Sequence, residues 1–295
     1  MLYSLMRESR VVIEYDGRAY GFDALSDYTA GTSYEEFKAN RRTIHRRSNY
    51  AYSKITAQSP SSISLALNFS SNALEGLFFE LMGFIEVDGM YQMPLFSNNI
   101  EPKMFSVYII NKNTSLRFDN CFATTCDFSL DKSVPVLNVG IESGYFEEVG
   151  HPLNSYTLDQ GEVLPFSLPQ VSSNGRVLPG LMSAGMSFQQ QCEWRGDRSL
   201  FDINKIYNNR RAIVNELNSS ALISMYYAKS LQIDSTHNIK PDVGLPVQIR
   251  NKYIVVDFPS TKITKRLDLT DVYKIDYDVI PTEQSDPVRI KLIGD

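Results

Sequence analysis

Apolar and polar residues alternate most clearly over residues 63–69, which read ISLALNF. Successive side chains of an extended strand point to opposite faces of a sheet, so a period of two predicts a strand with one buried face. The apolar face is formed by Ile63, Leu65, Leu67 and Phe69, and the opposite face by Ser64, Ala66 and Asn68.

The same alternation recurs in both halves of the chain. Over residues 122–130 one face is predicted to carry Phe122, Thr124, Cys126, Phe128 and Leu130, and the other Ala123, Thr125, Asp127 and Ser129. Over residues 273–278 Tyr273, Ile275 and Tyr277 oppose Lys274, Asp276 and Asp278, and over 288–293 Val288, Ile290 and Leu292 oppose Arg289, Lys291 and Ile293. Strands with one apolar and one polar face are typical of antiparallel sheets.

One amphipathic helix is well signalled. Asn72 and Glu75 have the spacing of a capping box, and Gly83 is a good terminator. Between them Leu74, Leu77, Phe78 and Leu81 recur at helical spacing. The pattern predicts a helix over residues 73–82 whose apolar stripe covers the sheet. A second capping box, SYEE at residues 33–36, predicts a shorter helix after Ser33.

Three short matches relate the two halves of the chain. EYDGRAYGFD at 14–23 and EWRGDRSLFD at 193–202 share an acid, an aromatic residue, a glycine and Phe-Asp at the same spacing. VYIINK at 107–112 matches VQIRNK at 247–252, and SSISLALNF at 61–69 matches SSALISMYY at 219–227 more weakly. The matches follow the same order in both halves, which indicates a duplication.

The stretch between the halves, residues 147–180, carries four prolines and no sustained periodicity, as connecting segments do. We therefore expect a first domain over residues 1–150, a linker over 151–179 and a second, shorter domain over 180–295. The predicted fold class is mainly β, with a β-sandwich or partial barrel and one flanking helix in each of two tandem domains.

Composition restricts the function classes. The 295 residues are 43% hydrophobic and 21% charged, as expected for a globular chain, and the net charge of −5 gives no basic footprint for nucleic acid. No apolar run reaches the length of a transmembrane helix, and the first residues lack the pattern of a signal peptide. Three cysteines make no disulfide framework and suggest production in a reducing cytoplasm.

Candidate catalytic and metal-binding chemistry is sparse. The sequence contains no P-loop, no Gly-x-Ser-x-Gly and no dinucleotide fingerprint. Cys121 and Cys126 are five residues apart, a spacing that places them on opposite faces of a regular strand and argues against a shared metal. We therefore predict no enzyme activity, no metal and no cofactor.

The order of elements resembles the phage tail tube protein family. The resemblance is strongest over residues 45–84, HRRSNYAYSKITAQSPSSISLALNFSSNALEGLFFELMGF, and continues through the paired strands at 104–148. In that family an inner sheet is followed by a helix, a β-hairpin and a late strand rich in small and acidic residues. The resemblance covers most of residues 1–150, and the second half enters through its similarity to the first. It implies two tandem tail-tube-like domains.

The resemblance also implies an assembly. Tube domains form six-fold rings, and relatives with two domains in one chain form trimers with pseudo-six-fold symmetry. Four strands from each of six domains give about 24 strands, which at ~4.8 Å spacing and ~40° tilt close a circle about 48 Å across. Inward side chains reduce this to a channel of roughly 35–40 Å, wide enough for duplex DNA about 20 Å across.

A channel for DNA should repel phosphates, because Lys and Arg contacts to phosphates retain the polyanion. The small, neutral and acidic faces of the predicted strands meet that need, with Lys274 as an exception. The candidate lumen-facing residues are Ser64, Ala66, Asn68, Thr125, Asp127, Ser129, Asn138, Glu142, Lys274, Asp276 and Asp278.

A basic stretch over residues 38–47, with a shorter echo near 210, leaves three interpretations open: a solvated loop, a nucleic-acid patch, or a contact between stacked rings. In the last case the basic residues meet acidic residues of the next ring, and charge complementarity sets the stacking register. The candidate inter-ring residues are Lys38, Arg41, Arg42, Arg46, Arg47, Arg210, Arg211, Glu147 and Glu148.

The sequence thus predicts a virion structural protein, the major subunit of a phage tail tube, assembled in the host cytoplasm as homotrimeric rings that stack around a DNA channel. Sheath, tape-measure, terminator and baseplate proteins are its expected partners, DNA passes without specific binding, and no membrane anchor is expected. The nearest alternative is a trimeric baseplate hub or tail terminator. An alternative from another class is a β-rich carbohydrate-binding or hydrolytic protein.

Overall fold

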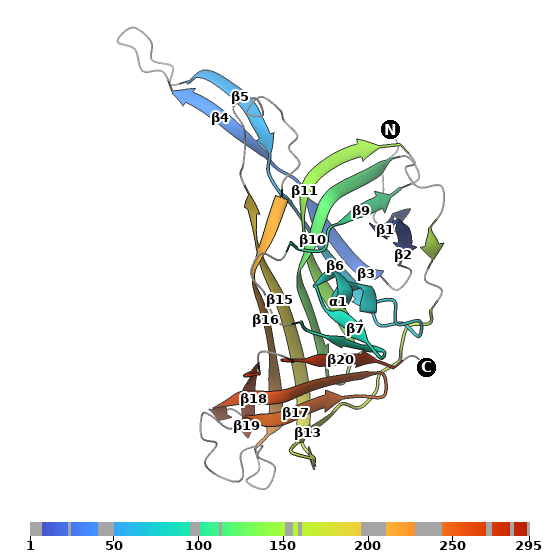
Figure 1. Cartoon of the computed structure of the whole chain (residues 1–295), viewed down its shortest axis with the longest axis vertical. Helices are drawn as coiled ribbons and strands as arrows, with labels where there is room; N and C mark the ends of the chain where they lie inside the picture. Colours follow the sequence, from blue (N-terminus) through green and yellow to red (C-terminus); the bar gives the residue numbers. More distant parts are fainter. Residues whose placement is uncertain are drawn as a thin grey trace.

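The structure, a computed structural model, describes residues 8–22, 25–40, 50–94, 101–111, 114–150, 156–158, 161–195, 211–227, 244–269, 273–283 and 286–293. Only the backbone is described for residues 35, 37–40, 50–58, 195 and 211. The chain is mainly β, as predicted, and its N-terminal and C-terminal halves both contribute to one large sheet (Figure 1).

Eight strands, four from each half, form the long body of this sheet, and every neighbouring pair is antiparallel. In spatial order they are β3 (Leu25–Gly31), β6 (Ser61–Asn68), β11 (Val136–Val149), β10 (Ser115–Leu130), β15 (Leu181–Arg195), β16 (Arg211–Tyr226), β19 (Tyr273–Pro281) and β18 (Ile254–Leu269). Among the described strands the ladders never return to their starting strand, so the sheet of one chain is not closed into a barrel.

Shorter strands branch from β10 and β18 in the same manner. From β10 the ladder continues through β9 (Phe105–Ile110) and β1 (Arg10–Tyr15) to β2 (Arg18–Gly21), which β12 (Thr157–Leu158) joins in parallel. From β18 it continues through β17 (Leu245–Arg250) and β13 (Gln170–Ser173) to β14 (Arg176–Leu178). A further branch runs from β18 through β20 (Arg289–Leu292) and β8 (Met90–Gln92) to β7 (Ile85–Val87).

Three tight hairpins follow from their turn residues. The two central residues are Asp16-Gly17 between β1 and β2, Asp88-Gly89 between β7 and β8, and Asn174-Gly175 between β13 and β14. All six residues have φ between 49° and 76°. Type I′ turns require a positive φ at both central positions, and Asp-Gly and Asn-Gly tolerate it best.

The predicted helix exists but is shorter than expected. α1 spans Gly76–Leu81 with Glu75 as its N-cap residue and without a side-chain cap, so the predicted capping box of Asn72 and Glu75 is wrong. Its C-terminus is as predicted: Gly83 has φ 89°, its N–H donates to the carbonyl of Glu80 at 2.8 Å, and the N–H of Phe84 donates to the carbonyl of Phe79 at 3.0 Å. These two bonds are the Schellman arrangement that ends a helix at glycine.

The predicted short helix after Ser33 is wrong. Residues Tyr34–Asn40 form strand β4, which pairs with β5 (Tyr50–Gln58) in a separate two-stranded sheet. In Figure 1 this hairpin, called the arm below, projects beyond the end of the main sheet. Pairing with a partner strand satisfies the backbone groups that the capping box would have served. No helix is described in the second half, and the segment between β16 and β17 lies mostly outside the described residues.

A β-bulge overturns the predicted faces of Phe122 and Ala123. Opposite β11, the register of β10 shifts between Ala123 and Thr125, so Thr124 is the extra residue. Ala123 is therefore buried on the same side as Cys126, and Phe122 lies on the opposite side. The prediction that Cys121 and Cys126 point to opposite faces is wrong for the same reason: both thiols are buried in the core, and burial raises their pKa.

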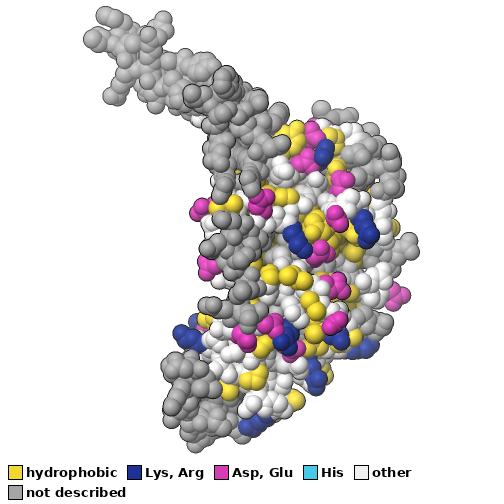
Figure 2. Space-filling model, viewed as in Figure 1, with side chains coloured by type: hydrophobic (Ala, Val, Ile, Leu, Met, Phe, Trp, Pro, Cys, Tyr) yellow, Lys and Arg dark blue, Asp and Glu magenta, His cyan; other side chains and the backbone are white. Residues whose placement is uncertain are grey.

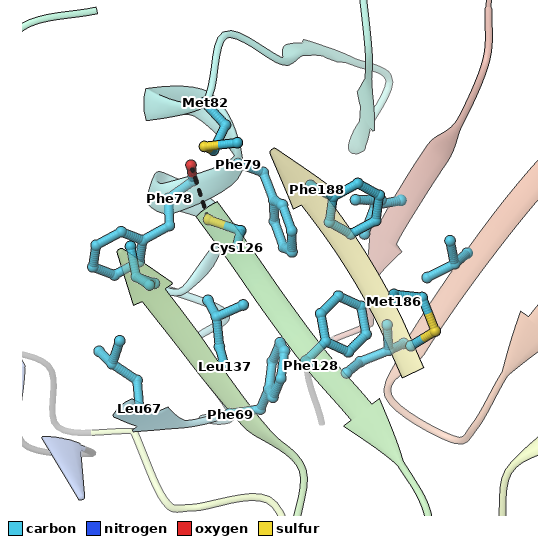
Figure 3. Close-up of a cluster of buried hydrophobic side chains, with 14 of the residues drawn as sticks. Leu67, Phe69, Phe78, Phe79, Met82, Cys126, Phe128, Leu137, Met186 and Phe188 are labelled. Carbon is cyan, nitrogen blue, oxygen red and sulfur yellow. Dashed lines mark hydrogen bonds between the residues drawn. The ribbon is translucent and has the colours of Figure 1, made fainter. Parts of the chain in front are cut away.

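One continuous core holds both halves together (Figure 3). Phe79 of α1 has its ring centroid 6.2 Å from that of Phe128 on β10 and 6.0 Å from that of Phe188 on β15, in edge-to-face geometry. The ring of Phe69 lies 5.5 Å from Phe128. The helix thus packs across the ladder β10–β15, where the first half of the chain meets the second.

Part of the predicted linker belongs to the sheet. Strands β13 and β14 lie within residues 151–179, and β13 pairs with β17 of the second half. Before them the chain is fastened to both halves: the N–H of Leu164 donates to the carbonyl of Phe69 at 2.8 Å, and Ser167 Oγ accepts from the N–H of Lys252 at 3.1 Å. The connection is therefore docked against the body.

Candidate functional site

The eight-strand sheet has one covered and one open face. On the covered side lie α1 and the short strands, to the right of β10 and β15 in Figure 1, and the side chains pointing there form the core. No described element covers the other face over these strands in that view. Most of its side chains are small or polar, and we call it the polar face.

All eleven residues predicted to line a channel lie on this polar face. Directly opposite residues of an antiparallel pair point to the same side of the sheet. The register therefore identifies which residues of each neighbouring strand lie on the polar face. Ala66 stands opposite Asn138, Asn138 opposite Asp127, and Asp127 opposite Ser187. In the second half Ser224 stands opposite Asp276, and Asp276 opposite Arg266.

The sequence reasoning missed the two central strands of the face. β15 and β16 contribute polar-face residues Ser183, Gly185, Ser187, Gln189, Glu216, Asn218, Ser220, Leu222 and Ser224. Over residues 183–188 a signal was present, because serine and glycine alternate with Ala184, Met186 and Phe188, all of them buried. Some aliphatic side chains interrupt the polar character of the face, among them Leu222 and Ile280, which are 45% and 46% exposed.

A glycine makes room for the bulge in the first half of the face. A Cβ atom at Gly140 would lie 2.6 Å from Thr125 Oγ1 and 2.8 Å from Thr124 Oγ1, closer than any real side chain comes. Instead the N–H of Gly140 donates to Thr125 Oγ1 at 3.2 Å. Two threonines opposite one glycine therefore fit only because that position lacks a side chain.

The polar face is acidic. Along the ladders of the eight strands the carboxylates of Asp27, Asp127, Glu142, Glu216, Asp268, Asp276 and Asp278 outnumber the cations of Lys262, Arg266 and Lys274. All three cations lie on β18 and β19, the last two strands of the sheet. On the side shown in Figure 2, Lys and Arg are interspersed with Asp and Glu over the described surface.

Two of those cations are already paired on the face. Asp276 Oδ2 lies 3.3 Å from Arg266 Nη2 and 3.9 Å from Lys274 Nζ, and its Oδ1 accepts from Ser224 Oγ at 2.6 Å. Lys274 Nζ also lies 3.2 Å from Asp268 Oδ2. The side chain of Asp276 is only 5% exposed. Asp276 is therefore a structural anchor, whereas Asp278 on the same strand is exposed.

The pKa of Asp276 reflects this environment. Burial disfavours the charged carboxylate, but the hydroxyl of Ser224, the Arg266 guanidinium and the Lys274 ammonium outweigh burial, and together they lower the pKa. A carboxyl group whose pKa is lower in the folded chain stabilises it above its unfolded pKa of about 3.9, and that stabilisation is lost as the pH falls through the folded pKa.

We expect Asp276→Asn to lower the free energy of unfolding by about 1–2 kcal/mol at pH 7, because charge-assisted hydrogen bonds are lost. The difference from the unaltered chain should shrink as the pH falls from about 4 through the lowered folded pKa of Asp276, below which both chains carry a neutral side chain. Urea unfolding at pH 7 and pH 3 measures it. Asp278→Asn is the matched control, since its carboxylate is exposed and accepts only a 3.3 Å bond from Thr264 in the described contacts. Equal effects of the two variants at pH 7 would contradict the anchoring role.

The end of the polar face nearest the arm is partly aromatic. Trp194 Nε1 donates to Glu142 Oε2 at 2.8 Å, and the rings of Trp194 and Phe122 lie 5.0 Å apart. Glu142 is thus held within the chain, and burial raises the pKa of the nearby Cys192 thiol to about 12.

The predicted inter-ring residues are only partly described. Arg41, Arg42, Arg46, Arg47 and Arg210 lie outside the described residues, and only the backbone is described for Lys38 on β4 and Arg211 on β16. On β11, Glu148 is exposed, whereas Glu147 receives hydrogen bonds within the chain from Tyr145 Oη at 2.8 Å and Arg117 Nη1 at 3.3 Å. The predicted meeting of the acidic and basic sets therefore involves side chains outside the described residues.

The described residues contain no group of three or more His, Cys, Asp or Glu side chains arranged to hold a metal ion. No helix within that part of the chain has the length and hydropathy that crossing a membrane requires.

An open acidic face on a sheet that does not close within one chain fits the predicted class, a structural protein of a phage tail tube. Residues 1–295 match the family model described as the bacteriophage baseplate tube protein family, and the chain belongs to that family. It is also 57% identical, over 100% of its length and 99% of the relative's, to baseplate tube protein p140 of Escherichia phage T5.

These matches confirm the predicted resemblance and the location in the virion tail. They support a structural tube protein of the tail or baseplate, and the predicted alternative of a baseplate component fits them. The finer prediction, the major subunit of the tail tube, is not what the family's description says.

Proposed function

We propose that three copies of this chain form a ring of the baseplate tube, in which the polar faces line a channel that DNA crosses. One observation carries this proposal: each chain presents an eight-strand antiparallel sheet, with four strands from each half and one acidic face left open. Three such sheets supply about 24 strands, the number that gives a circle about 48 Å across.

The chemistry of the polar face supports passage of DNA without retention. The excess of carboxylates over cations repels phosphates, and Arg266 and Lys274 are already held by carboxylates of the face. Cations held in this way are less available to displace the counterions of DNA.

Contacts along the tube axis are assigned to the ends of the long strands. The arm β4–β5 projects beyond the main sheet and includes Lys38, and the next basic residues follow in sequence. We place the contact with the neighbouring ring there. Other tail or baseplate proteins, among them the tape-measure and terminator proteins, are then its partners above and below.

The test is the subunit number of the assembled ring. Baseplate tubes isolated from virions should release a complex of three chains of 33.5 kDa each when measured by native mass spectrometry. Electron microscopy of the same preparation should show a hollow ring with three-fold symmetry. A ring of six chains, or a complex without a central channel, would overturn the proposal.

A further inference from the structure

Both ends of the eight-strand sheet present a strand edge without a described partner strand. β3 pairs with β6 along one edge only. β18 pairs with β19 over residues 261–269, and on its other edge β17 reaches only as far as Thr261. β20 pairs with residues 254–257 of β18 on the same edge as β19. An edge of this kind can accept a strand from another chain. Because eight antiparallel strands alternate in direction, β18 of one chain and β3 of another would meet antiparallel.

The two halves follow one strand plan. The order β3, β6, β11, β10 in the first half corresponds to β15, β16, β19, β18 in the second. A neighbour continues each order, β9 beside β10 and β17 beside β18, followed by a tight hairpin, β1–β2 or β13–β14. Under this plan the ladder β10–β15 inside the chain corresponds to a ladder between β18 and the β3 of a second copy.

The correspondence extends to single residues on β3 and β15. The sequence match of 61–69 with 219–227 aligns Leu65 with Ile223. Tyr28 stands opposite Leu65 and Ala184 stands opposite Ile223, so Tyr28 corresponds to Ala184. An extra residue then interrupts both strands at the same point, Ser26 in β3 and Met182 in β15. Bulges are specific structural features, and two of them at equivalent positions fix the alignment of the strands.

The hairpin strands β10 and β18 align in the same way. Asp127 stands opposite Asn138, which stands opposite Ala66. Arg266 stands opposite Asp276, which stands opposite Ser224, the equivalent of Ala66. Asp127 therefore corresponds to Arg266, and Ser129 two residues later corresponds to Asp268.

We propose that β18 of one chain pairs with β3 of the next chain in the register that the internal ladder β10–β15 displays. Within the chain Ser129 stands opposite Gly185 and Phe128 opposite Met186. Their equivalents place Asp268 opposite Thr29 and Leu267 opposite Ala30 of the second copy. This seam makes the polar faces of neighbouring chains continuous. The inference rests on the proposed ring and adds to it the strands and the register by which it closes.

Engineered cysteines test the register in assembled tails. In a Cys192→Ser background, which leaves only the two buried native cysteines, one variant carries Thr29→Cys with Asp268→Cys and another Ala30→Cys with Leu267→Cys. Directly opposite residues of an antiparallel ladder form alternately hydrogen-bonded and non-hydrogen-bonded pairs, so the two designed variants include one pair of each kind. In such pairs the two Cα atoms lie about 4.5–5.5 Å apart, a distance that a disulfide can bridge. The control carries Thr29→Cys with Thr264→Cys. Thr264 lies four residues, about 13 Å, along β18 from Asp268, so this pair is out of the proposed register.

After oxidation, at least one designed pair should convert most of the chain into a covalent three-chain species that resists SDS and collapses to monomers on reduction. The control should remain monomeric under the same conditions. Two outcomes would overturn the proposed register while the proposed three-chain ring still stands. One is cross-linking of the control instead of the designed pairs, and the other is no cross-linking in any variant although the rings still contain three chains. A subunit number other than three in the unaltered tube overturns the ring itself.

Discussion

Replacing Phe79 by alanine is expected to lower the free energy of unfolding by about 3–5 kcal/mol, a large part of the stability of a typical domain. The Phe79 side chain is fully buried, and its ring lies within about 6 Å of the rings of Phe84, Tyr91, Phe128 and Phe188. Truncation removes contacts to both halves of the chain at once and leaves a cavity where α1 crosses the ladder β10–β15.

Phe166→Ala is the matched control for this substitution. Phe166 lies in the connection between the halves and is 43% exposed, so its truncation should change the free energy of unfolding by less than about 1 kcal/mol. Urea unfolding of the isolated chains, followed by circular dichroism, measures both variants. Equal losses would show that the core does not depend on the helix, and that the two halves hold together through their strands alone.

Strand patterns were predictive where the strand is regular. β6 alternates without interruption, and its predicted apolar face, Ile63, Leu65 and Leu67, is fully or almost fully buried. β10 contains a bulge at Thr124, which no local pattern announces, and the prediction failed on the N-terminal side of it. One extra residue moves every side chain before it to the other face. The error therefore concerned Phe122 and Cys121 but not Cys126, Asp127 or Ser129.

Capping boxes predicted the starts of helices less reliably than glycine predicted the end of a helix. Gly83 ends α1 because a positive φ there costs glycine little, a property of the residue itself. The capping box of Asn72 and Glu75 failed because the helix begins later than predicted, with Glu75 itself as the N-cap residue. At residues 33–36 the competing structure is strand pairing in the arm, a contact with residues some twenty positions later that no short window contains.

The sequence matches differ in what they mean structurally. VYIINK and VQIRNK lie at β9 and β17, which hold equivalent places beside β10 and β18. The ten-residue frames do not correspond in this way: EYDG lies at the hairpin β1–β2, whereas Glu193 lies near the end of the long strand β15. The counterpart of β1–β2 is the Asn-Gly hairpin β13–β14, which shares its turn chemistry and little else.

The polar-face residues of β6, β19 and the C-terminal part of β10 could be predicted because alternation alone decides them. The internal ion pairs of the polar face could not, because they depend on the register between β16, β19 and β18. That register distinguishes Asp276, which is buried and paired, from Asp278, which is exposed two residues later. A test of the channel lining must therefore avoid Asp276, since a change there would alter the fold as well as the charge.

Reversing exposed charges on the polar face is expected to slow genome ejection strongly. Asp278→Lys with Glu216→Lys changes the charge by four units per chain at two exposed positions on neighbouring strands. In a ring of three chains the channel then gains six lysines facing the DNA phosphates. Each new phosphate contact releases counterions, so we expect virions with this variant to eject DNA roughly tenfold more slowly at low salt. The defect should shrink as the salt concentration rises.

The control carries the same change in charge away from the polar face. Glu86 on β7 and Glu162 in the connection are exposed, and Glu86→Lys with Glu162→Lys should leave the ejection rate within about twofold of the unaltered virion at every salt concentration. The release of DNA from purified virions, followed by a fluorescent dye at 50 mM and 500 mM salt, distinguishes the two. Equal rates for both variants, in particles with equal tail content, would mean that β16 and β19 turn their polar side away from the genome.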